Sequence, residues 1–185
     1  MIEVVFFGRG GMGAVTAAQL LARVATIEGK FGQAIPEFGA ERRGAIVRAY
    51  LRIDERPIEK HSSITAGDYV VVLDGRILRQ TNVKAYGKPE ARYIVNTKEE
   101  EPWYIAVDAT SIALKHGLVA AGWPLVNMVM AAAFAAVSKA VSIEGIIRTI
   151  PEFVPARAAR ANIEAAKEAY EVVSKKLAGA LAQQG

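Results

Sequence analysis

Cysteine is absent from the 185-residue chain, and histidine occurs only twice. Without cysteine sulfur, the chain itself can form no disulfide, no thiolate metal site and no iron–sulfur cluster. The two histidines, His61 and His116, stand apart and show no ligand spacing around them. We therefore expect neither a bound metal nor a histidine-based catalytic dyad in this chain.

Long runs of one charge and uninterrupted apolar spans are also missing. The formal net charge is +4 without any run of five Lys or Arg, so nucleic-acid binding is not expected. The uncharged stretch 118–137 is interrupted by Gly122, Pro124 and Asn127, which favours a buried core helix over a membrane span. No basic segment followed by an apolar run opens the chain. These features predict a soluble cytoplasmic protein without a membrane partner.

The composition, with 52% hydrophobic and 23% charged residues, is that of a globular protein. The length suits a single domain covering residues 1–185. Apolar strand-like runs alternate with helical spacing, which predicts an α/β fold: a Rossmann-like, doubly wound, mainly parallel sheet with flanking helices. Strands are expected at 2–7, 31–35, 45–53, 69–73, 93–95 and 103–107, and helices at 14–28, 108–114, 124–140, 142–150 and about 156–182.

A glycine pattern, G-x-G-x-x-G, falls at Gly8, Gly10 and Gly13 between the first expected strand and helix. Such glycines permit a tight turn, and the amides of a helix N-terminus attract anions. A dinucleotide site would also need an acidic residue ending the next strand. Glu37 has a tolerable spacing but follows Pro36 and opens a loop, so it supports NAD(P) binding poorly. Three interpretations of the pattern therefore stay open. The loop binds NAD(P), it binds another phosphate-bearing ligand, or its glycines only permit close packing of the strand and the helix.

A second group of polar residues, Glu41, Arg42 and Arg43, lies in the glycine-flanked segment from Pro36 to Gly44. Two adjacent guanidinium groups in a loop can form paired hydrogen bonds with a phosphate or carboxylate. The alternative is an exposed ion-pair cluster, which would contribute little to stability.

Two aspartates each follow an expected strand at its carboxyl end, where open α/β folds bind ligands. They are Asp74 and Asp108. Asp108 precedes Thr110 at the start of an expected helix, a position more typical of a helix cap than of a catalyst. Neither a serine nucleophile elbow nor a Walker lysine is present in the sequence.

Together these segments resemble the gamma subunit, or gamma domain, of pyruvate and related 2-oxoacid:ferredoxin oxidoreductases. The resemblance covers roughly residues 1 to 170. Where the family commonly carries Gln, this chain has Met12, which removes an amide hydrogen-bonding group from the loop tip. The matching segments are Gly8 to Val15, Pro36 through Gly44, Val95 to Thr97, Asp108 to Ala113 and Pro124 to Asn127.

The resemblance implies that the chain is one subunit of a complex that oxidatively decarboxylates a 2-oxoacid, expected to be pyruvate. Coenzyme A is the acyl acceptor, and the products are acyl-CoA, carbon dioxide and reduced ferredoxin. In the family, thiamine diphosphate with Mg sits in the alpha and beta subunits, and iron–sulfur clusters sit in the beta and delta subunits. The expected partners are therefore alpha, beta and delta subunits, with ferredoxin as the external electron acceptor.

For this chain the resemblance implies a role in assembly and in holding coenzyme A at or near its surface, with no catalytic residue of its own. Two alternatives are a stand-alone NAD(P)-binding Rossmann oxidoreductase and a purely architectural subunit without ligand contacts. The candidate coenzyme A-binding residues are Gly8, Gly10, Gly11, Met12, Gly13, Glu41, Arg42, Arg43 and Asn127.

Overall fold

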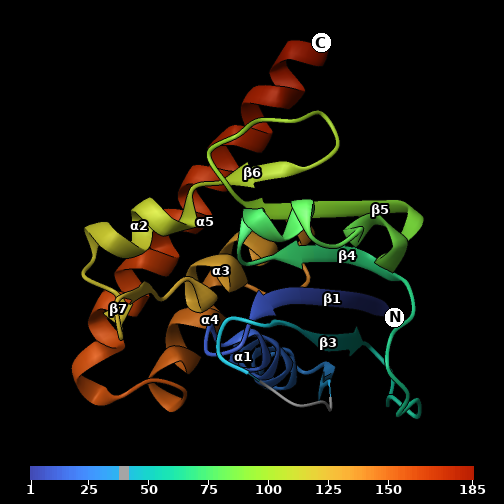
Figure 1. Cartoon of the computed structure of the whole chain (residues 1–185). Coiled ribbons are helices and arrows are strands. Elements are labelled where there is room, and N and C mark those ends of the chain that lie inside the picture. The colour runs from blue at the N-terminus through green and yellow to red at the C-terminus, as the bar shows by residue number, and fades with distance from the viewer. Residues whose placement is uncertain (38–41) are drawn as a thin grey trace.

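The computed structural model describes residues 1–37 and 42–185, and a six-stranded sheet lies at its centre (Figure 1). The strand order is β2-β3-β1-β4-β5-β6. β1, β4, β5 and β6 pair in parallel, whereas β3 runs antiparallel to both of its neighbours, β1 and β2. The α/β class and the mainly parallel sheet with flanking helices are thus confirmed. The strands are β1 (Ile2–Arg9), β2 (Phe31–Pro36), β3 (Ile46–Asp54), β4 (Gly67–Val72), β5 (Gly87–Asn96) and β6 (Ile105–Val107).

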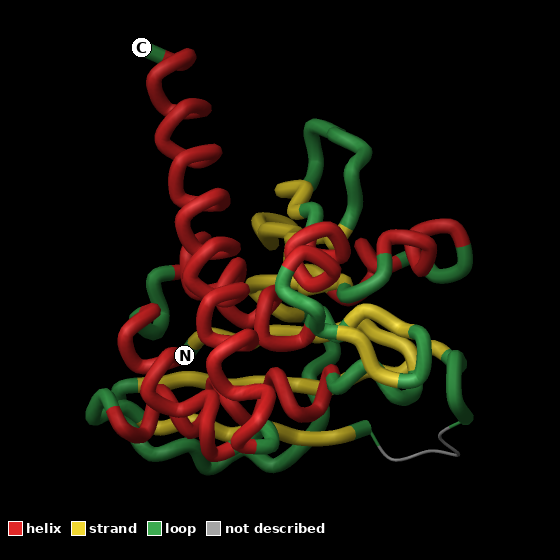
Figure 2. Tube along the Cα trace, turned by 90° about the vertical axis from the view of Figure 1, so that its left-hand side faces the viewer, coloured by secondary structure: helices red, strands yellow, loops and turns green. Residues whose placement is uncertain are grey.

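The two faces of the sheet are covered differently. Val4 and Phe6 of β1 face a large core to which all five α-helices of the described chain contribute, and Figure 2 shows these helices in front of the strands. Val5 and Phe7 face a smaller core, closed by the short 3-10 helices η1 (Gly75–Arg79) and η2 (Val83–Tyr86). The α-helices are α1 (Ala14–Ile27), α2 (Ala109–Lys115), α3 (Asn127–Ser138), α4 (Ile143–Thr149) and α5 (Ala156–Gln184).

The sheet grows outward from β1 in both directions, which explains why its connections lie on opposite faces. α1 leads from β1 toward β2, whereas η1 and η2 lead from β4 to β5 on the other side of the sheet. Crossovers of one hand that step in opposite directions must cover opposite faces. The short connections of the second face are too small for helical periodicity, and they were not expected from the sequence.

The alanine-rich helix α3 forms the centre of the large core, where residues 128–137 are all buried. Its Phe134 ring meets the rings of Phe6 and Tyr69 edge-to-face, at centroid distances of 6.3 and 5.4 Å. The small alanine side chains let α5 lie close along α3. The part of the uncharged stretch from Asn127 to Val137 therefore lies in a buried core helix, as the sequence indicates.

The start of α3 differs from the sequence prediction. The helix begins at Asn127 rather than at Pro124, which lies instead in β8 (Trp123–Pro124). β8 pairs with β7 (Val119–Ala120), and the intervening Ala121 and Gly122 have φ values of 49° and 80°. Two left-handed residues in succession are typical of the tight turn that joins antiparallel strands. Pro124, which was expected to begin the helix, therefore belongs to the hairpin instead.

The long C-terminal helix packs on the core only along part of its length. The apolar residues of α5 contact the core up to Leu177, whereas Leu181 is 71% exposed. Figures 1 and 2 both show that the C-terminal end of α5 extends beyond the sheet, so its last turns do not pack on the core. Among the described residues, none of the helices combines the length and apolarity that crossing a bilayer requires.

We predict that Phe134→Ala lowers the free energy of unfolding by about 3–5 kcal/mol, because it leaves a cavity between α3 and the sheet. Urea titration followed by circular dichroism would measure the change. Phe31→Ala is the control, since the Phe31 side chain is 43% exposed and its loss should cost less than about 1 kcal/mol. Equal losses for the two variants would contradict the central placement of α3.

Candidate functional site

The candidate site lies at the carboxyl ends of the parallel strands. From β1 the chain continues to strands on one side of the sheet, and from β4 it continues to strands on the other side. The point at which the direction of winding reverses, the switch point, therefore lies between β1 and β4. Ligands of open α/β sheets bind outside the carboxyl ends at such a point. A cleft of about 610 Å³ opens there, and its lining includes Met12, Asp74, Arg76, Asn96, Thr110 and Trp123.

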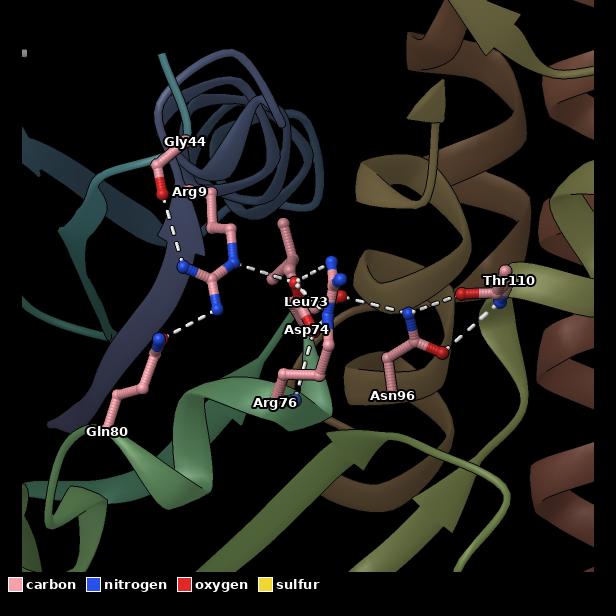
Figure 3. Close-up of polar contacts among 8 residues, drawn as sticks. All are labelled: Arg9, Gly44, Leu73, Asp74, Arg76, Gln80, Asn96 and Thr110. Carbon is pink, nitrogen blue, oxygen red and sulfur yellow. Dashed lines mark hydrogen bonds and ion pairs between the residues drawn. The ribbon is translucent and has the colours of Figure 1, made fainter. Parts of the chain in front are cut away.

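An ion-pair network joins the ends of β1 and β4 (Figure 3). The Arg9 Nε donates to Asp74 Oδ2 at 2.8 Å, and Arg76 Nη2 donates to the same oxygen at 2.7 Å. The Asp74 carboxylate also caps η1 by accepting from the Arg76 backbone N–H at 3.0 Å. Arg9 further donates to the carbonyl of Gly44 at 3.1 Å and to Gln80 Oε1 at 2.7 Å. Arg9 thereby joins three segments that are distant in sequence: the end of β1, the segment at Gly44, and η1, which it contacts at both caps.

The Asp74 carboxylate remains ionised in this network. Burial raises its pKa, but hydrogen bonds from Arg76 and Arg9 outweigh that effect and lower the pKa from 3.8 to about 2. A group with so low a pKa is a poor general base or acid near neutral pH. Through these hydrogen bonds Asp74 anchors the cleft wall.

A second set of hydrogen bonds joins β4, β5 and α2 (Figure 3). The buried Asn96 donates from Nδ2 to the Leu73 carbonyl at 2.9 Å and to Thr110 Oγ1 at 3.0 Å. In return, the Thr110 N–H donates to Asn96 Oδ1 at 3.2 Å. Asp108 Oδ1 accepts from the Ser111 N–H at 3.1 Å, so Asp108 is the helix cap that the sequence indicates.

The glycine loop and the twin-arginine segment, which the sequence singles out separately, lie side by side. A Cβ added to Gly10 would be 2.3 Å from the Arg42 carbonyl oxygen, so only glycine fits there. The Gly10 N–H donates to the Ala45 carbonyl at 2.8 Å, and the Gly44 N–H donates to the Gly10 carbonyl at 3.2 Å. Part of the glycine pattern therefore serves close packing between two backbone segments.

Gly13 and Asn127 also meet. Gly13 has a φ of +81°, and a Cβ added to it would be 2.5 Å from Asn127 Nδ2. Gly11 has a φ of +91° with open space around it. The Met12 N–H donates to the Arg9 carbonyl at 2.9 Å. The N–H groups of Gly10 and Met12 already donate to backbone carbonyls. The donors considered for the predicted anion are therefore the N–H groups of Gly11, of Gly13 and of the first turn of α1.

The remaining predicted residues lie around the same loop. Arg42 and Arg43 are exposed, and Arg43 Nη2 donates to the Ala121 carbonyl in the β7–β8 turn at 3.2 Å. A smaller cavity of about 190 Å³ lies between the glycine loop, Arg43 and this hairpin, and Met12 and Trp123 line both cavities. Gly8 lies within β1, where a Cβ added to it would be 3.3 Å from the Cβ of Ala14. Glu41 lies outside the described residues.

Glu37, the acidic residue considered for a dinucleotide site, is engaged elsewhere. Its carboxylate accepts from Arg48 Nε at 2.9 and 3.0 Å, at the end of β2. β3 separates β2 from β1, so Glu37 does not end the strand beside the glycine-loop strand, as a ribose-binding acid would. This arrangement disfavours NAD(P) binding.

The chemistry of the site is that of binding. Within residues 1–37 and 42–185, no three His, Asp or Glu side chains gather as metal ligands would. The site presents guanidinium groups, backbone amides and aromatic rings. Such groups can hold and orient an anionic ligand.

Comparison with known proteins identifies the family. The family model described as pyruvate ferredoxin/flavodoxin oxidoreductase matches residues 3–172. Pyruvate synthase subunit PorC of Methanothermobacter thermautotrophicus is 42% identical over 179 residues, covering 95% of this chain and 97% of the relative. The chain belongs to this oxidoreductase family. The pyruvate/ketoisovalerate oxidoreductases common subunit gamma of Pyrococcus furiosus is 46% identical over 182 residues, covering 92% and 96%.

A solved structure agrees. The crystal structure of pyruvate oxidoreductase subunit PORC from Thermotoga maritima matches with a TM-score of 0.77 and 31% identity, covering 92% of this chain and 95% of that one. The resemblance to gamma subunits of 2-oxoacid:ferredoxin oxidoreductases is thus confirmed.

The Arg9–Asp74 network was missed because only the Asp74 position at a strand end was visible in the sequence. Its arginine partners come from contacts that the fold creates.

We predict that Asp74→Asn removes a pH-dependent stabilisation. The folded pKa of about 2 lies below the usual 3.8, so the ionised carboxylate stabilises the fold above about pH 4, and this contribution is lost as the pH falls toward 2. The variant should lose about 2 kcal/mol at pH 6 and clearly less at pH 2.5. Urea titrations at both pH values would measure this, and a pH-independent difference would contradict it.

Proposed function

We propose that this gamma subunit binds the phosphates of coenzyme A in a cytoplasmic complex whose alpha, beta and delta subunits carry the redox cofactors. Pyruvate is the proposed 2-oxoacid, in keeping with the names of the relatives. The binding surface would consist of the Gly11 and Gly13 amides together with Arg42 and Arg43. The proposal rests on one observation above all, the contact of the glycine loop with the twin-arginine segment through Gly10.

The electrostatics of this surface support the proposal. The first turn of α1 contains no acidic residue, so nothing on that turn offsets the partial positive charge of the helix N-terminus. The exposed Arg42 and Arg43 add two permanent cations beside it. Guanidinium groups and helix amides in one place form the combination that phosphate groups require.

The contribution of this chain to the reaction would be positional. Thiamine diphosphate in the partner subunits would supply the decarboxylation, and their iron–sulfur clusters would pass the electrons to ferredoxin. On the gamma subunit, binding of the phosphates would hold the coenzyme A thiol close to the reacting centre in the partner subunits. This proximity would accelerate acyl transfer. The ionised, hydrogen-bonded Asp74 is consistent with a role that involves no proton transfer from this cleft.

We predict that the double variant Arg42→Ser and Arg43→Ser raises the KM for coenzyme A by about 10-fold or more in the reconstituted complex. Each lost charge-assisted hydrogen bond weakens binding, whereas kcat should stay close to that of the wild type. Arg56→Ser with Lys60→Ser is a matched control, because it removes two exposed cations near the opposite end of the sheet. Steady-state kinetics measures KM, and gel filtration measures assembly.

The outcomes separate the competing roles. An unchanged KM together with normal assembly would remove the proposal. Impaired assembly with an unchanged KM would instead favour a purely architectural subunit. Binding of a nicotinamide cofactor by the purified single chain would favour a stand-alone oxidoreductase.

A further inference from the structure

Both tryptophans of the chain line the cleft at the switch point. Trp103 is already engaged in packing on the second face of the sheet. Its ring meets Tyr93 and Tyr104 edge-to-face at 5.2 and 4.8 Å, and Lys84 Nζ lies 4.3 Å from its centroid. Trp103 therefore closes the cleft as part of the core.

Trp123 has a different setting. It is half-buried in β8, directly after the tight turn at Ala121 and Gly122, and it lines both the cleft and the smaller cavity. Ala121 holds a left-handed φ of 49°, a conformation that persists in a non-glycine residue only where the surroundings impose it. The hairpin thus presents an indole ring at a defined place, on the wall shared by the two cavities.

The charges of the two cavities differ. In the cleft, Asp74 is balanced by Arg9 and Arg76, and Arg79 lies 3.6 Å from Glu99. Glu101 also lines the cleft, so three carboxylates lie near the three guanidinium groups of Arg9, Arg76 and Arg79, and the net charge is close to zero. A cleft with aromatic walls and little net charge suits a planar, uncharged heterocycle. The smaller cavity, with the open backbone at Gly11 and the Arg43 side chain, suits an anion instead.

We propose that Trp123 stacks on the adenine ring of an adenine nucleotide, the nucleotide end of coenzyme A, bound in the cleft. From there the attached phosphates pass Met12 to reach Gly11 and Arg43, because Met12, Trp123 and Pro124 line both cavities. The direction of the phosphates rests on the function proposed above. The stacking contact rests on Trp123 and the cleft, and it makes Trp123 a residue that recognises the base.

The test uses the reconstituted complex and two competitive inhibitors against coenzyme A. ADP carries the base and two phosphates, whereas inorganic pyrophosphate carries phosphates alone. Trp123→Leu should raise the inhibition constant of ADP and the KM for coenzyme A about 10-fold, while the inhibition constant of pyrophosphate and kcat stay unchanged. Phe31→Leu is the control, since this exposed ring lies at the start of β2, away from the carboxyl ends of the parallel strands.

The Arg42 and Arg43 double variant distinguishes failure of this inference from failure of the phosphate surface, because it should weaken both inhibitors. If Trp123→Leu leaves ADP inhibition unchanged while the arginine variant weakens it, stacking is wrong and the phosphate surface stands. If Trp123→Leu weakens ADP while the arginine variant changes neither inhibitor, stacking stands and the proposed phosphate surface is wrong.

Two further results would overturn the stacking contact. One is equal weakening of ADP and pyrophosphate by Trp123→Leu, which would indicate a displaced hairpin. The other is a lack of ADP inhibition in the wild-type complex. Should Trp123→Leu fail to assemble, Trp123→Phe decides the matter. This variant retains a smaller ring and should raise the ADP constant about two- to threefold without affecting pyrophosphate, and no change in ADP would overturn the inference.

Discussion

The antiparallel pairing of β3 with β1 is the constraint on which the rest of the site depends. Its register sets Ile46 opposite Arg9, so the residues just before β3 must lie beside the glycine loop just after β1. There, the backbone of Arg42 comes so close to Gly10 that a side chain at position 10 is impossible. The same pairing displaces β2, and with it Glu37, from β1. One feature of the topology therefore brings cations to the loop and takes away the acid that a dinucleotide site would need.

The Arg9–Asp74 pair extends this constraint across the switch point. It joins the end of β1 to the residue after the end of β4, where the sheet changes winding direction. Because Arg9 also holds the Gly44 carbonyl, the arginine-bearing segment and the cleft wall are positioned by one side chain. The pairing also neutralises the carboxylate without protonating it. Charge in the cleft is thus balanced, while the cations next to the glycine loop remain exposed.

Much of the fold could be predicted from local pattern, and its misses have a physical cause. β1 is predicted by a short apolar run and α1 by helical spacing, and the glycines mark the boundary between them. The start of α3 was misplaced because the β7–β8 hairpin is also held by a tertiary contact, the Arg43 Nη2 donating to the Ala121 carbonyl at 3.2 Å. In the site, the glycine loop and the arginine pair carry recognisable motifs. Arg9 lies within the glycine motif, but its role is not visible there because its partners Gly44, Asp74 and Gln80 lie far away in the sequence. Trp123 belongs to no motif.

A subunit can contribute to catalysis by binding the part of a substrate that does not react. Binding energy from such a remote part can orient the reacting end, provided that the binding surface is rigid. The site described here has this rigidity, since Asn96, Asp74 and the hairpin each accept a hydrogen bond from another segment, donated by Thr110, Arg9 and Arg43 respectively. The nucleotide end of coenzyme A is large, charged and chemically inert in acyl transfer. Holding it on a separate subunit would leave the partner subunits free to shape only the environment of the thiol and the redox cofactors.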